Sequence, residues 1–119
     1  MPLTIKSSTG VHHFTVDVAA TPEQQERGLM FVKSLLPDRG MLFPYDPPQD
    51  VAFWMHNTLI PLDILYIRSD GTIVRITKAK ALDETPLPSG QPVAAVLEIR
   101  SGRAGELGIK EGDVASWTH

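Results

Sequence analysis

The stretch FWMHNTLIPLDILYI, residues 53–67, decides the fold of this chain. It is strongly apolar, yet it contains His56, Asn57 and Asp63, and Pro61 interrupts it. Apolar residues on both faces of an alternating pattern predict strands that are covered on both sides, or strands with one face lining a pocket. Short polar side chains between two such strands predict a tight corner, because they form hydrogen bonds with nearby backbone.

Strand patterns continue on both sides of this stretch. Alternating or continuous apolar runs predict strands within residues 5–18, 41–43, 51–55, 62–67, 72–77, 93–99 and 114–117. Ser69-Asp70-Gly71 lies between two of these runs, and such a tight turn predicts a hairpin. The proline-rich segments 44–50 and 83–92 predict extended surface loops.

Helices are expected to be few and short. Thr21 and Gln24 have the spacing of a capping box, Pro22 suits the first helical position and Gly28 is a natural stop. The segment FVKSLLPDRG, residues 31–40, predicts a second turn or a short helix ending at Pro37-Asp38, and residues 104–107 predict one helical turn. We therefore expect one domain over residues 1–119, of the α+β class and mostly antiparallel β. Its core should be barrel-like or sandwich-like, with two or three short helices.

Composition excludes some classes of function. The chain of 119 residues has 11 Lys and Arg against 14 Asp and Glu, a net charge of −3. This balance argues against a nucleic-acid partner, and no basic block would hold an anionic membrane surface. The chain has no cysteine, which excludes disulfides and thiolate catalysis within it.

Neither a targeting segment nor a transmembrane segment is evident. The first ten residues, MPLTIKSSTG, lack an apolar core of the signal-peptide type. The longest apolar run, near residues 59–67, is interrupted by Pro61 and Asp63. We expect a periplasmic or extracytoplasmic protein if a signal peptide has been removed, and a cytoplasmic one otherwise.

The corner that follows Met55 is the first candidate site. His56, Asn57 and Asp63 can point into a cleft walled by Trp54 and Met55, since polar groups beside apolar walls are the usual make-up of a ligand pocket. The simpler interpretation is that these polar residues only build a demanding turn. Both interpretations remain open at this point.

Glu98, in the sequence VLEIR, is the second candidate. If its side chain turns inward it is a buried carboxylate that needs a partner, and Arg27 and Arg100 are available as cations. A structural ion pair or an exposed position is the simpler interpretation. His12 and His13 are adjacent, so on a strand they face opposite sides, and we expect no metal site and no cofactor.

With these residues in hand, the chain resembles the family called domain of unknown function 192. The segments that carry the resemblance are ERGLM (26–30), GMLF (40–43), FWMHNTLIPLDILYI (53–67), DGTIV (70–74), AVLEI (95–99) and GIKEGD (108–113). One departure is His56, where the family more often has lysine. The resemblance implies a compact, mostly β domain with short helices and many exported relatives, but it implies no activity.

Three functions are consistent with these observations. The first is a non-enzymatic binding domain for a small molecule or a protein segment, with its cleft near residues 54–63. Its candidate ligand-binding residues are Arg27, Trp54, Met55, His56, Asn57, Asp63 and Glu98. The second is a hydrolase that uses Asp63 or Glu98 as general base, which requires a raised pKa in a cleft. The third is a structural or oligomerisation module, and we expect a monomer or a weak homodimer.

Overall fold

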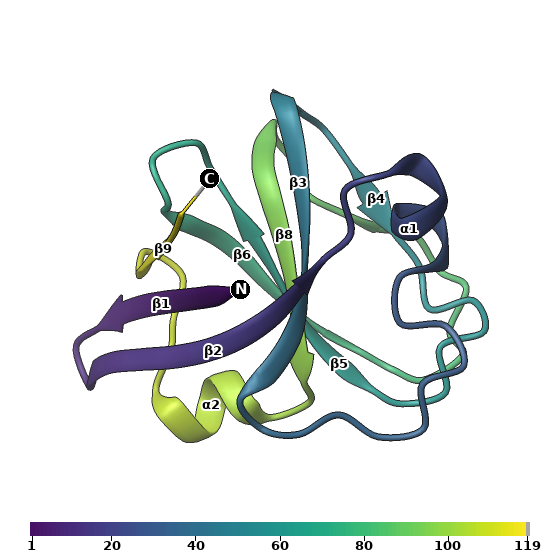
Figure 1. The fold of residues 1–119 in the computed structure, drawn as a ribbon, viewed down its shortest axis with the longest axis horizontal. Coiled ribbons are helices and arrows are strands. Elements are labelled where there is room, and N and C mark those ends of the chain that lie inside the picture. Colours follow the sequence, from purple (N-terminus) through teal and green to yellow (C-terminus); the bar gives the residue numbers. More distant parts are fainter. Residues whose placement is uncertain (119) are drawn as a thin grey trace.

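Residues 1–118 are described by the structure, which is a computed structural model. The strands are β1 (Pro2–Ser7), β2 (Gly10–Val18), β3 (Arg39–Gln49), β4 (Ala52–Phe53), β5 (Leu62–Ile67), β6 (Ile73–Ala79), β7 (Leu87–Pro88), β8 (Val93–Arg100) and β9 (Val114–Trp117), and the helices are α1 (Pro22–Arg27) and α2 (Arg103–Leu107). Seven strands form one sheet in the order β6-β5-β8-β3-β2-β1-β9, and β4 pairs with β7 beside it (Figure 1).

The large sheet is strongly curled. Its neighbouring strands are antiparallel except for the parallel pair β2 and β3. The two edge strands approach each other at an isolated bridge between Thr72 and Val114, and the Ile73 amide donates to the Asp113 carbonyl at 2.8 Å. The result is a mostly antiparallel half-barrel with two short helices, which confirms the predicted fold class.

Both faces of the sheet are covered, and β5 shows why the central stretch is apolar throughout. All six residues of β5 are buried. Because side chains alternate along a strand, Leu65 and Ile67 join one hydrophobic cluster while Leu62 and Ile64 join another. The first cluster fills the inside of the half-barrel, and the second lies under α1, β4 and the loops around them.

Both helices begin and end close to the predicted positions. Thr21 accepts a hydrogen bond from the Gln24 amide and the Gln24 side chain accepts one from the Thr21 amide, so the capping box is confirmed. Gly28 ends α1 with φ of 49°, and a Cβ at this position would lie 3.3 Å from the Phe43 ring. The second helix, α2, begins after Gly102, which provides no side-chain cap.

Several element boundaries differ from the prediction. The segment expected as one strand over residues 5–18 is a hairpin of β1 and β2, and β3 extends through the proline-rich segment to Gln49. Of the turn or short helix expected over residues 31–40, only turns occur: they lie at Phe31 and at Pro37-Asp38, with irregular structure between them. Phe31 has φ of 66°, which is incompatible with helix continuation. The strand expected at 51–55 shortens to β4, because the Met55 amide donates to the Asp83 carbonyl in a loop.

Candidate functional site

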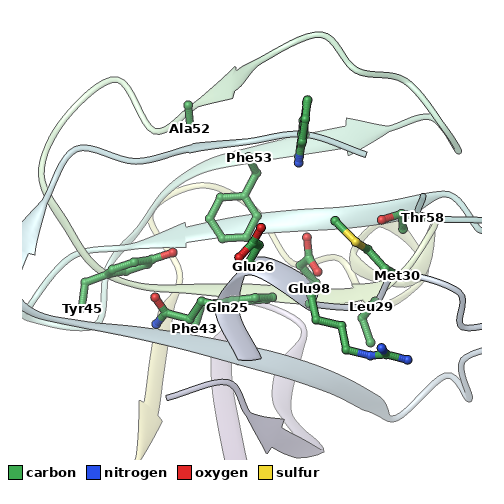
Figure 2. A pocket seen from close by; sticks show the side chains of 13 residues that line it. Gln25, Glu26, Leu29, Met30, Phe43, Tyr45, Ala52, Phe53, Thr58 and Glu98 are labelled. Atoms are coloured by element: carbon green, nitrogen blue, oxygen red, sulfur yellow. The ribbon is translucent and has the colours of Figure 1, made fainter. Parts of the chain in front are cut away.

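A cavity of about 210 Å³ lies between α1, the turn that follows it, β3, β4 and β8. It opens to solvent beside the exposed side of α1. Figure 2 shows the side chains around it. The lining residues are Gln25, Glu26, Arg27, Gly28, Leu29, Met30, Phe43, Tyr45, Ala52, Phe53, Trp54, Thr58 and Glu98.

Glu98 lies at the inner end of this cavity. Its neighbours Leu97 and Ile99 belong to the cluster inside the half-barrel, so alternation turns Glu98 to the other face, toward the cavity. The residue is only 4% exposed, and its carboxyl forms no hydrogen bond or ion pair with any of residues 1–118. Burial raises the pKa of Glu98 to about 8. At neutral pH this carboxyl therefore retains its proton more often than not.

Aromatic rings form the wall next to Glu98. The rings of Phe43 and Phe53 meet edge to face with centroids 4.9 Å apart, and the Tyr66 ring lies behind Phe53 at 6.4 Å. Burial and the nearby Glu98 raise the pKa of Tyr45 to about 12, so its phenol stays neutral at physiological pH. Tyr66 donates its hydroxyl to the Leu87 carbonyl at 2.6 Å, which anchors β7 and the loop above the cavity.

Trp54 forms part of the outer wall and is half exposed. Its ring stacks on the His56 ring, with centroids 4.6 Å apart and planes at 25°. The His56 ring in turn pairs with the carboxylate of Glu84. His56 therefore does not line the cavity; its ring stacks on the Trp54 ring instead.

The corner that follows Met55 is stabilised mainly by backbone hydrogen bonds. Met55 is fully buried in the core and does not line the cavity. Asn57 has φ of 55°, a conformation that asparagine tolerates better than most residues, and its carbonyl accepts a hydrogen bond from the Phe31 amide at 2.9 Å. The Thr58 carbonyl accepts from the Leu82 amide at 3.0 Å. The turn-building interpretation of Asn57 is the one that this geometry supports.

Asp63 lies on the opposite face of the sheet from the cavity. In the pairing of β5 with β8, Asp63 stands opposite Ile99, whereas Glu98 stands opposite Ile64. Residues directly opposite each other share a face, so the two carboxylates point in opposite directions. Asp63 is 1% exposed, and its Oδ2 accepts a hydrogen bond from the Ala104 amide in the first turn of α2 at 3.0 Å.

The structure thus brings together three of the seven candidate residues, Arg27, Trp54 and Glu98. The ion pairs considered for Glu98, with Arg27 or Arg100, do not occur among the described residues, and none joins Arg27 to Asp63 there.

Other lining residues were not among the candidates, notably Glu26, Met30, Phe43, Tyr45 and Phe53. Four of them lie in or beside the segments that carry the family resemblance, which was the available signal. No group of three or more His, Asp or Glu residues within 1–118 is arranged to hold a metal ion. Nor does any helix in that range have the length and apolarity to cross a membrane.

Comparisons with known proteins agree with this fold. The model of the family DUF192, described as "Uncharacterized ACR", matches residues 3–117. A protein of unknown function from Novosphingobium aromaticivorans DSM 12444 is 44% identical, with a TM-score of 0.95 over 98% of this chain and 84% of its own. A Sinorhizobium meliloti 1021 protein described as a "putative transcription regulator" is 40% identical, with a TM-score of 0.93 over 97% of this chain and 91% of its own. No curated protein matches significantly. The chain belongs to the DUF192 family.

Proposed function

We propose that this member of the DUF192 family is a binding domain for a small polar molecule, which enters the cavity beside α1 and forms hydrogen bonds with Glu98. The observation that carries the proposal is the carboxyl of Glu98, which is buried, faces the cavity and has no partner within residues 1–118. Leaving a buried polar group without a hydrogen bond costs about 1–3 kcal/mol. A ligand that satisfies this carboxyl would offset that cost.

The make-up of the cavity supports a ligand of limited size. Apolar and aromatic side chains line it together with the polar groups of Gln25, Glu26, Arg27, Thr58 and Glu98, so polar groups converge beside apolar surface. Its volume of about 210 Å³ lies below the roughly 300–1,000 Å³ of sites for drug-sized ligands. A compact polar molecule therefore fits better than a folded partner.

The position of each side chain around the cavity suggests its role in binding. Trp54 supplies contact area at the outer wall, and the pair of His56 with Glu84 orients it. Arg27, exposed on α1, lies beside the cavity and can reach a second polar group of the ligand. Met55, Asn57 and Asp63 have no direct part in this proposal.

A thermal-shift screen against metabolites, sugars and divalent ions tests the proposal. A true ligand at a hundred times its Kd stabilises the fold by about 2.7 kcal/mol. Stabilisation should be lost in Glu98→Gln and reduced in Trp54→Ala, both of which should remain folded. The matched control is Asp63→Asn, which alters a carboxylate of similar burial on the other face. A hit that stabilises Glu98→Gln as strongly as the wild type would contradict the proposal.

A hydrolytic enzyme is the second candidate, and the raised pKa of Glu98 favours it. A general acid or base works best when its pKa lies near the working pH, and about 8 meets that condition. Asp63 does not reach the cavity, so Glu98 would act without a second carboxylate from β5. Assays with nitrophenyl esters, phosphates and glycosides test this candidate. Turnover by the wild type, absent in Glu98→Gln and rising through pH 8, would support an enzyme.

An oligomerisation module remains the third prediction. Phe31, Leu36, Leu59 and Leu82 are large apolar side chains that are exposed to solvent. Light scattering at high protein concentration separates a monomer from a weak homodimer. We propose no nucleic-acid partner, because the net charge of −3 opposes binding to a polyanion.

A further inference from the structure

The Glu98 carboxyl determines which hydrogen-bonding groups a ligand of this cavity needs. An ionised carboxylate only accepts hydrogen bonds, and no N–H or O–H group within residues 1–118 donates to this one. The hydroxyl of Tyr45 also lines the cavity and has no hydrogen-bond partner in the described part of the chain. Both groups can accept hydrogen bonds, so the complementary ligand is rich in donors. An ammonium group has three donors and no acceptor.

The walls around Glu98 also favour a cation. Phe43, Tyr45, Phe53 and Trp54 line the same cavity. The faces of aromatic rings attract cations, and the attraction grows where water is excluded. These rings do not compensate the charge of an anion, and a buried carboxylate repels one.

The other charged and titratable groups around Glu98 leave a negative balance. Glu26 and Arg27 on α1 line the cavity with it, so two carboxylates oppose one guanidinium. Tyr45 on β3 and Tyr66 on β5 interact electrostatically with Glu98, and both are neutral because their pKa values are raised to about 12. Arg75, on β6, acts on Tyr66. With Glu98 ionised, the lining therefore carries one net negative charge.

We propose that the cavity binds a small molecule with a primary ammonium group, which pairs with the Glu98 carboxylate while its short apolar body packs against the aromatic wall. This inference rests on the function proposed above. A primary ammonium suits the site better than a quaternary one, because a buried ion pair needs hydrogen bonds as well as opposite charges.

Binding of an ammonium group should release a proton. In the empty cavity, burial raises the pKa of Glu98 to about 8, so at pH 7 the carboxyl is mostly protonated. A cation beside it favours the ionised form, and the proton passes to solvent. Affinity should therefore rise up to tenfold per pH unit below pH 8 and level off above it. The ligand itself stays charged over this range, since alkyl amines titrate near the lysine value of about 10.4.

Calorimetry with n-butylamine and n-butanol tests the inference on the wild-type protein. The two probes have similar size but only the amine is charged. We expect the amine to bind at least tenfold more tightly. At pH 6.5, titrations in two buffers with different ionisation enthalpies should show the release of nearly one proton, and at pH 9.5 almost none. These measurements require no variant.

Variants then assign the effect to Glu98. Glu98→Gln should lose the preference for the amine and the proton release, whereas Asp63→Asn should retain both. Equal binding of amine and alcohol, or binding of neither, overturns the inference. The proposed function survives either result if the broader screen finds a neutral or anionic ligand whose stabilisation depends on Glu98. It fails with the inference if no compound shows that dependence.

Discussion

Asp63 and Glu98 are two buried carboxylates on paired strands, and they differ in the face they occupy and in whether any donor pairs with them, although Oδ1 of Asp63 is also unpaired among the described residues. Asp63 points into the half-barrel and accepts a hydrogen bond from the Ala104 amide of α2. Glu98 points to the other face, borders a cavity and has no partner in the described chain. Burial alone therefore does not define the role of a carboxylate. The role of a buried carboxylate also depends on whether a hydrogen-bond donor pairs with it.

The two helices differ in where the groups that cap their first turns come from. The α1 helix carries its own capping box in the sequence that starts it, and Arg27 in its last turn suits the helix dipole. The α2 helix has glycine at its N-cap and receives Asp63 from a distant strand instead. The N-terminus of the helix beside the cavity is thus capped locally, although Gln25 also donates to the Pro44 carbonyl of β3, whereas the first turn of the other helix is capped by a carboxylate from a distant strand.

The largest expected effect is a pH dependence of stability between pH 4.5 and pH 8 that comes from Glu98. Its pKa rises from an unfolded value of 4.5 to about 8 in the fold, so the folded state binds a proton more tightly than the unfolded state. The free energy of unfolding should therefore fall as pH rises between 4.5 and 8, by at most about 1.4 kcal/mol per unit. Urea denaturation across this range measures it.

Glu98→Gln is the variant that isolates this effect. It removes the titrating group, so its stability should vary less with pH than that of the wild type, and it should exceed the wild type most clearly near pH 8. A wild type whose stability rises from pH 5 to pH 8 to the same extent as that of Glu98→Gln would contradict the assignment.

The second effect concerns Asp63. Asp63→Ala leaves the Ala104 amide without its acceptor, and an unsatisfied buried donor costs about 1–3 kcal/mol. Asp63→Asn should cost less, because an amide oxygen can still accept this hydrogen bond. Denaturation at pH 7 gives the free energies, and hydrogen exchange of the Ala104 amide localises the change. Equal stability of Asp63→Ala and wild type would show that the contact contributes nothing.

A third variant tests whether the two helices are stabilised independently. Thr21→Ala removes the side chain that accepts from the Gln24 amide and should cost about 1 kcal/mol. Thr21→Ser keeps the hydroxyl and is the control. Hydrogen exchange should increase in α1 but not in α2, because the two helices are capped by different groups. Faster exchange in both helices would mean that they are coupled.

The smallest effect is expected at the corner beside the cavity. Asn57 has φ of 55°, so Asn57→Gly should change stability by less than about 0.5 kcal/mol. Asn57→Ala should cost about 1 kcal/mol, because a left-handed conformation is unfavourable for alanine. Thermal denaturation compares the two variants. A larger loss for glycine than for alanine would mean that the Asn57 side chain has a role beyond backbone shape.

Local features of the fold followed from the sequence. Thr21, Pro22 and Gln24 predicted the start of α1, and Gly28 predicted its end. The apolar run of β5 and the turn at Asp70-Gly71 predicted the central hairpin with β6. These features depend on residues close together in the chain, where backbone preference and side-chain alternation act directly. The hairpin at residues 7–10 was missed, although Leu3 and Ile5 alternate with polar residues before the turn and Gly10 follows it, because the alternation predicted one strand across the turn.

The cavity depends on contacts that no short stretch contains. The sequence by itself determined that Asp63 and Glu98 lie in apolar strands, but not which side of the sheet each faces relative to the other. That was decided by the register of β5 against β8, since a shift of one residue would reverse every side chain. The placement of α1 and β4 over the face that bears Glu98 then made the cavity. Pairing across distant strands and packing between layers are properties of the assembled chain, and so only the tertiary structure decided where a ligand can bind.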